Sequence, residues 1–212
     1  MQLLPWHARS RRPRRHARLC AATPALLLGL VCTAASAEEP DLGWLDRDAI
    51  ARGEVVFYSE RAERPQIVVV KSATEIDAPA EAIWSILKDC QTAPEYVPNV
   101  VSCRSIEVVD AGRAELFIQT VKPAFFVPSF EHVFRLEYWP YSHIDLHRVS
   151  GPIALMEGAW WLVPQPTGKI LLVYELKLDP GMPIPRFFVR ATLKRDLPKV
   201  LAAVRERSEA KR

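Results

Sequence analysis

The sequence predicts an α+β domain in which one long helix lies on a face of an antiparallel β-sheet. Two observations predict this fold class. Most of residues 54–178 are short β-branched and aromatic runs with period-two alternation, separated by turn residues. Residues 186–207 instead carry one apolar stripe at helical spacing. Strands followed by one long helix give a two-layer arrangement around a single core.

The N-terminus has the pattern of an export signal. Residues 1–18 hold six arginines and no acid, the next apolar run is densest at 25–31, and Ala35 and Ala37 supply an A-x-A cleavage site. The apolar run is shorter than the roughly 20 residues of a spanning helix. We expect residues 1–37 to be a cleaved signal peptide that directs the chain to a bacterial periplasm. An uncleaved signal anchor is the alternative.

Loss of this segment would change the net charge. The whole chain has 28 Lys and Arg against 25 Asp and Glu, and removing six arginines leaves 22 against 25, a formal charge of −3. The basic balance of the full chain therefore belongs to the signal. The mature balance does not indicate nucleic acid as a partner.

Only Cys90 and Cys103 remain after the signal. Two thiols in an oxidising compartment favour a disulfide, which would close a loop of about 14 residues and contribute up to about 3 kcal/mol. Free buried thiols, or redox or metal chemistry, are the alternatives. A zinc site needs four ligands at closer spacing. His143 and His147 would lie about 13 Å apart on one strand face, too far to chelate one ion, so we expect no metal and no cofactor.

The first part of the mature chain is predicted to change from a leader to strands. Residues 38–53 are expected to form a loose polar leader with one helical turn around 45–50. The β-branched composition predicts strands at 55–58 and 66–76.

Two short helices are expected next. Asp77 can cap a helix and Pro79 suits its first turn. One apolar face follows at helical spacing, formed by Ala80, Ile83, Trp84 and Leu87. Pro94 and Pro98 bracket a second helical turn that contains Tyr96, because proline cannot continue a helix interior.

Alternation predicts the remaining strands. They are expected at 100–109, 114–122, 130–138, 143–149, 155–163 and 169–178. Residues 186–207 then form the long helix, in which Pro198 predicts a bend or a break. Its predicted apolar stripe consists of Val189, Leu193, Leu197, Val200, Leu201 and Val204.

Four segments carry a resemblance to a known superfamily. They are residues 76–84 (IDAPAEAIW), 87–89 (LKD), 94–98 (PEYVP) and 193–198 (LKRDLP). In this order they resemble the START / polyketide-cyclase superfamily, especially its coenzyme-Q-binding and polyketide-cyclase-like bacterial branch. The resemblance implies the helix-grip fold, a curved antiparallel sheet wrapped around a long C-terminal helix, with two short helices after the first long strand.

On this resemblance residues 54–212 form one START/polyketide-cyclase-like domain. It implies that the two short helices close one end of the sheet, that Tyr96 plugs this corner, and that a Cys90–Cys103 disulfide attaches it to the next strand. It does not specify a ligand, because this architecture serves lipid carriers, quinone binders, aromatases and hormone receptors.

The candidate ligand-binding residues are mostly aromatic. A curved sheet held by one helix can leave a cavity, and apolar walls with few polar groups are usual for ligand sites. The expected walls are Trp84, Phe117, Phe130, Phe134, Trp160 and Tyr174. Phe125 and Phe126 lie between prolines in a strand-joining loop, where exposed aromatics suit a cover over a cavity. The alternatives are a loop packed on the core or a domain contact.

Two polar residues could carry chemistry. His132 alternates with Phe130 and Phe134 and should face inward, where it needs either a ligand carbonyl or a hydroxyl such as that of Tyr138 or Tyr174. Glu157 would have a raised pKa inside an apolar chamber, and would be solvated at a strand end. Standard catalytic signatures are absent from the sequence.

These observations favour a binder over an enzyme. We expect a hydrophobic small molecule, such as a lipid, quinone or isoprenoid, to bind in an internal cavity, with transient membrane contact and without nucleic acid. One alternative is a polyketide cyclase or aromatase that uses His132 or Glu157 as acid or base. Another is a protein-interaction module that docks through Phe125 and Phe126.

Overall fold

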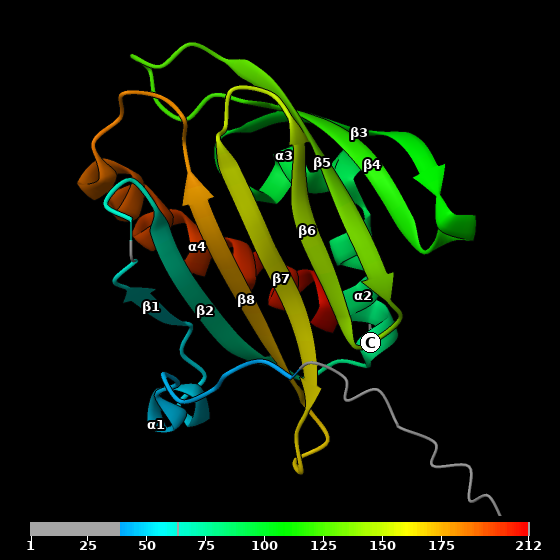
Figure 1. Ribbon diagram of the computed structural model, residues 1–212. Helices are drawn as coiled ribbons and strands as arrows, with labels where there is room; N and C mark the ends of the chain where they lie inside the picture. Colours follow the sequence, from blue (N-terminus) through cyan, green and yellow to red (C-terminus); the bar gives the residue numbers. More distant parts are fainter. Residues whose placement is uncertain (1–38, 63, 212) are drawn as a thin grey trace, which may run out of the picture. The chain divides into compact units, whose positions relative to one another are not determined.

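Eight antiparallel strands form one sheet in the order β1-β2-β8-β7-β6-β5-β4-β3 (Figure 1). The strands are β1 Val56–Glu60, β2 Val68–Ile76, β3 Val100–Val109, β4 Ala114–Val121, β5 Phe130–Trp139, β6 His143–Ser150, β7 Leu155–Pro164 and β8 Ile170–Asp179. The computed structural model describes residues 39–62 and 64–211. The predicted signal peptide, residues 1–37, lies outside the described residues.

One long helix, α4 (Arg186–Glu209), lies on one face of this sheet, which confirms the predicted fold class (Figure 1). The helix buries Val189, Leu197, Val200, Leu201 and Val204 of the predicted stripe. Pro198 does not break it. In β5 the burial alternates as predicted, with His132 and Phe134 buried on the helix side and Glu131 and Val133 more exposed.

The short helices after β2 lie on the same side as α4 (Figure 1). They are α2 (Ala80–Lys88), the 3₁₀ turn η1 (Cys90–Thr92) and α3 (Ala93–Tyr96). The Asp77 cap is wrong: Pro79 occupies the N-cap without a side-chain bond, and the Asp77 amide donates to Glu209 at the end of α4. The chain leaves the sheet extended as far as Pro79, so the N-cap lies two residues after the predicted one and the helix begins at Ala80.

A disulfide joins Cys90 of η1 to Cys103 of β3, as the resemblance implied. Tyr96 of α3 packs against the core, and its hydroxyl donates to the carbonyl of Ile86 in α2. The short helices are thus held to one another and to the sheet. A further 3₁₀ turn, η2 (Asp110–Gly112), joins β3 to β4.

The leader is not loose. The described leader forms α1 (Arg47–Ala51), close to the predicted turn, and Asp46 caps it through the Ala49 amide. Apolar leader residues pack on the sheet face opposite α4, and Asp41 pairs with the buried Lys71 of β2 at 3.4 Å. The sequence pattern missed this contact because the second face of β8 is also apolar, at Leu171 and Val173.

Candidate functional site

Two cavities lie in the core between the sheet and α4. The inner cavity has a volume of about 190 Å³ and the outer cavity about 220 Å³. Three side chains line both: Val97, which follows α3, and Leu197 and Val200 of α4. Each cavity alone is smaller than the roughly 300–1,000 Å³ of drug-sized ligand sites, whereas the two joined would fall within that range.

The outer cavity is almost entirely apolar and lies beside the loops at one end of the sheet. Ile153 of the β6–β7 loop, Met182 and Ile184 of the β8–α4 loop, and Phe188 of α4 line it, together with Phe130 of β5. Pro123 of the β4–β5 loop lines it as well, so the outer cavity lies next to a rim of three loops.

One acidic side chain, Asp196 of α4, lines the outer cavity but is neutralised there. Arg195 donates two hydrogen bonds of 2.7 Å to its carboxylate, and Asn99 donates a third of 3.0 Å. Burial raises the pKa of Asp196, but the bonds from Arg195 and Asn99 outweigh burial and lower it overall. Asp196 therefore ties α4 to the loop before β3 and leaves no uncompensated charge.

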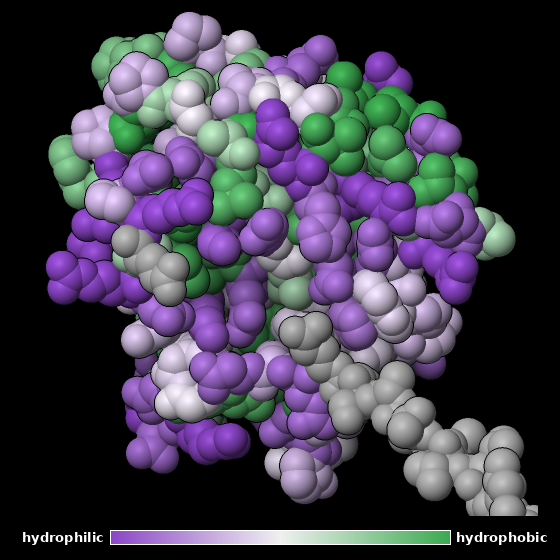
Figure 2. Space-filling model, in the orientation of Figure 1, coloured by the Kyte–Doolittle hydropathy of each residue, from purple (hydrophilic) through white to green (hydrophobic). Residues whose placement is uncertain are grey.

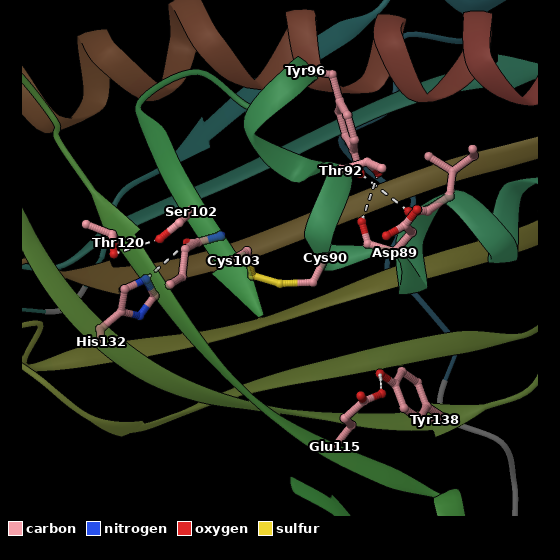
Figure 3. Close-up of a disulfide and its surroundings, with 12 residues drawn as sticks. Asp89, Cys90, Thr92, Tyr96, Ser102, Cys103, Glu115, Thr120, His132 and Tyr138 are labelled. Atoms are coloured by element: carbon pink, nitrogen blue, oxygen red, sulfur yellow. Dashed lines mark hydrogen bonds between the residues drawn. A yellow bond between two sulfur atoms is a disulfide. The ribbon is translucent and has the colours of Figure 1, made fainter. Parts of the chain in front are cut away.

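The inner cavity contains the buried histidine. His132 is 3% exposed, and its ring stacks on Phe134 with centroids 5.5 Å apart. Nε2 lies 3.1 Å from Oε1 of Gln119 on β4, as the dashed line in Figure 3 shows, whereas Nδ1 is buried without a partner. Burial lowers the pKa of His132 to about 4, so the ring is neutral at pH 7.

The remaining wall of the inner cavity is apolar or aromatic. Trp160 and Tyr174 stack with centroids 4.1 Å apart, and burial alone raises the pKa of the Tyr174 phenol. The Cys90–Cys103 disulfide also lines this cavity, and Figure 3 shows it near His132. Among the described residues that line it, none carries a charge at pH 7.

Exposed aromatic side chains gather at the rim. Phe125 and Phe126 of the β4–β5 loop are 93% and 57% exposed, and Phe187 at the start of α4 is 71% exposed. An external groove of about 500 Å³ runs between Phe126, Phe187 and the prolines of the β8–α4 loop. Figure 2 shows apolar patches at this end of the molecule.

A basic groove borders the same rim. Arg61, Arg186 and Arg190 line it together with Glu60, and its volume is about 240 Å³. Within the described part of the chain, none of these three arginines takes part in a salt bridge. Exposed aromatic and unpaired basic side chains therefore lie at the same end of the domain.

The nine predicted ligand-binding residues separate into three groups. Phe130 lines the outer cavity, and His132, Phe134, Trp160 and Tyr174 line the inner one. Trp84 and Phe117 are buried in the core but line neither cavity. Phe125 and Phe126 lie outside, at the rim.

Sequence reasoning missed several lining residues. Gln119 could have been found, because it alternates with Phe117 on β4 and pairs with His132 in the β4–β5 register. Val97 and Leu197 could not, since the sequence pattern of an apolar residue is the same whether its side chain borders a cavity or fills one. Gln119 is also the partner of His132 in place of the expected tyrosines, and Tyr138 instead donates to Glu115 at 3.2 Å (Figure 3).

The other catalytic candidate lies outside the cavities. Glu157 of β7 is exposed, pairs with Lys177 at 3.5 Å and lines neither cavity, so it is not the chamber acid that the enzyme alternative requires. His143 is buried between Trp139 and Trp161. Within the described ranges, no group of three or more His, Cys, Asp or Glu side chains could hold a metal ion. No helix there is both long and apolar enough to cross a bilayer.

The fold and cavities point to one family, and a family model decides it. The model for "Polyketide cyclase / dehydrase and lipid transport" matches residues 76–205, more than half of the chain. The chain belongs to this family. The resemblance to the START / polyketide-cyclase superfamily is thereby confirmed. Among curated proteins no sequence gives a significant match.

Solved structures of this superfamily share the fold. A STAR-related lipid transfer protein from Xanthomonas axonopodis is 17% identical, with a TM-score of 0.64 over 73% of this chain and 93% of that one. The Zhui aromatase/cyclase from Streptomyces sp. R1128 is 18% identical, with a TM-score of 0.59 over 68% and 95%. Human STARD10 is 15% identical, with a TM-score of 0.56 over 82% of each chain. At such identities the similarity shows the helix-grip fold alone.

Proposed function

We propose that the protein binds a hydrophobic small molecule, such as a lipid, isoprenoid or quinone of the coenzyme Q type, across the two interior cavities. The observation that carries this proposal is the pair of apolar cavities between the sheet and α4. Well-packed interiors hold few voids larger than a water molecule, and a void of this size forfeits packing contacts. A ligand would restore those contacts.

The two cavities share part of their walls. Val97, Leu197 and Val200 line both, so rotation of these side chains would connect the inner cavity to the outer one. Affinity would then rest on desolvation, at about 0.8 kcal/mol for each buried CH₂ group.

Access would run through the rim. On one side Arg148 donates hydrogen bonds to the carbonyls of Gly151 and Ile153, which fixes the β6–β7 loop. On the other side Phe125 and Phe126 are exposed on the β4–β5 loop. Movement of the β4–β5 loop would admit the ligand.

We further propose that this rim makes a transient contact with a membrane. The exposed phenylalanines would insert at the interface, and Arg61, Arg186 and Arg190 would lie against anionic lipid headgroups, each basic residue contributing about 1 kcal/mol. With the signal expected from the sequence, the membrane would be one that faces the periplasm.

The binding proposal is tested on the mature protein purified gently from its host. Native mass spectrometry and organic extraction should find a hydrophobic ligand, and adding coenzyme Q analogues or lipids to stripped protein should raise its melting temperature. If extraction finds no ligand and neither quinones nor lipids shift the melting temperature, the proposal fails.

The membrane proposal is tested by co-sedimentation with vesicles of phosphatidylethanolamine and phosphatidylglycerol. The Phe125→Ser/Phe126→Ser variant should lose binding, whereas Val108→Ser, an exposed residue of β3, should retain it. Equal sedimentation of both variants would refute insertion by the loop. If instead Phe126→Asp abolishes capture of a protein partner without affecting vesicles, the rim is a protein-docking surface.

A cyclase or aromatase is the second candidate, favoured by the neutral His132 beside the inner cavity. The imidazole could act as a base toward a polyketide-like substrate. The expected export argues against this activity, because activated thioester substrates are cytoplasmic. Turnover of a polyketide-like substrate that His132→Ala abolishes would favour the enzyme, and turnover unaffected by His132→Ala would dismiss this role.

A further inference from the structure

The polarity of the inner cavity restricts the chemical class of its ligand. Its wall offers Gln119, His132 and Tyr174 as polar groups, together with Tyr96, whose hydroxyl already donates to the carbonyl of Ile86. The rest of the lining is apolar or aromatic and includes Trp160 and Met156. An anionic headgroup placed there would lose its hydration without gaining a counter-charge, which is strongly unfavourable. This excludes carboxylates and phosphates from the inner cavity.

The hydrogen-bonding state of His132 restricts the class further. The bond from Nε2–H to Oε1 of Gln119 leaves Nδ1 as a bare acceptor, and this atom is buried without a partner. A ligand carbonyl has no proton to donate to Nδ1. A hydroxyl can donate to it and can also accept from the phenol of Tyr174 or the amide of Gln119.

We infer that the ligand is an uncharged amphiphile whose hydroxyl head lies in the inner cavity beside His132, Gln119 and Tyr174, with its apolar tail in the outer cavity. This inference rests on the proposed function. The outer cavity suits the tail because its lining is apolar and the carboxylate of Asp196 is already bound by Arg195 and Asn99. Long-chain alcohols, sterol-like alcohols, phenols and hydroquinones belong to this class, whereas fatty acids and phospholipids do not.

The test compares three probes on the stripped mature protein, each read by displacement of the neutral fluorophore N-phenyl-1-naphthylamine. The probes are 1-decanol, its isomer 1-methoxynonane, which accepts but cannot donate, and decanoate at pH 7.5. We expect 1-decanol to bind three- to tenfold more tightly than the ether, the effect of one hydrogen bond. Decanoate should bind more weakly than both.

His132→Leu locates the head group. It should bring the alcohol and the ether to equal affinity, and His132→Phe, which keeps an aromatic ring against Phe134, serves the same purpose if the leucine variant does not fold. Equal binding of alcohol and ether by the wild type, or an alcohol preference that survives in a folded His132 variant, would overturn the inference and leave the proposed function standing. Failure of all three probes to displace the fluorophore would instead count against an apolar site altogether.

Discussion

At the scale of single residues, His132 is a polar side chain that lowers the stability of the core in which it is buried. His132 is buried on β5 with one ring nitrogen unsatisfied, an arrangement that costs free energy in the absence of a partner. A phenylalanine would fit the alternation of β5 without that cost. Because the imidazole can be protonated, His132 makes the free energy of unfolding depend on pH, which a phenylalanine at this position would not do.

We predict that His132 destabilises the protein as the pH falls from 6.5 to 4. Burial lowers the pKa of His132 from 6.5 to about 4, so in this range the unfolded chain binds a proton that the folded protein does not. The free energy of unfolding should therefore decrease as the pH falls, by about 3 kcal/mol in total. Urea unfolding at pH 7.5 and 4.5 measures the change.

Because carboxylates also titrate in this range, the prediction concerns the difference between variants. His132→Phe should lose less stability on acidification than the wild type, whereas His147→Gln, which alters an exposed histidine of β6, should behave as the wild type. Parallel pH profiles for wild type and His132→Phe would contradict the assignment.

Gly181 in the β8–α4 loop is a second residue that cannot be replaced without strain, because this loop packs closely against the β6–β7 loop at the rim. Its φ is +66°, and an added Cβ would lie 2.4 Å from the carbonyl oxygen of Pro152 in the β6–β7 loop. Gly181→Ala should destabilise the protein by about 2 kcal/mol more than Gly168→Ala. Both substitutions place an alanine in the left-handed region, but only the new Cβ at position 181 would clash with the backbone of the neighbouring loop. Gly168 has a φ of +83° with open space around it. Equal urea midpoints would show that the two loops are not held together at this point.

At the scale of elements, the sequence predicted most of the sheet and α4 because each presents a regular apolar pattern to one core. The prediction from sequence was wrong where the conformation depends on surroundings that the local sequence pattern does not contain. The leader packs on the second sheet face through contacts that no local pattern contains. Pro198 leaves α4 unbroken, since the carbonyl that it cannot satisfy belongs to the exposed Lys194, where solvent can reach it.

The disulfide is the connection between elements that we expect to matter most. Cys90 and Cys103 are 13 residues apart and join η1 to β3 beside the inner cavity. The Cys90→Ser/Cys103→Ser variant should lose about 3 kcal/mol of unfolding free energy through the gain in entropy of the unfolded chain. Chemical denaturation with and without reductant measures this. Reductant should destabilise the wild type and leave the double variant unchanged; insensitivity of the wild type would show that the bridge contributes little.

At the scale of the whole molecule, several of the residues that line the cavities could be predicted from the sequence, but the presence of the cavities could not. Alternation predicted an inward-facing His132, and Trp160 and Tyr174 were among the aromatic residues expected in the walls; all three line the inner cavity. Whether facing side chains meet depends on the separation of α4 from the sheet and on the short helices between them. That separation is a property of the assembled layers, so Trp84 fills space where a wall was expected.

One substitution can test directly whether the two cavities are the binding site. Val97 is half-buried and lines both cavities from the end of α3, so Val97→Phe should fill the connection between them. Filling a cavity commonly raises stability, here by about 0.5–2 kcal/mol in stripped protein. It should also abolish both the ligand found on extraction and the rise in melting temperature on adding lipid or quinone. Val101→Phe makes the same change on the exposed face of β3 and should alter neither. A Val97→Phe protein that is more stable yet still responds to ligand would place binding outside these cavities, and the exposed groove at the rim would then be the next site to examine.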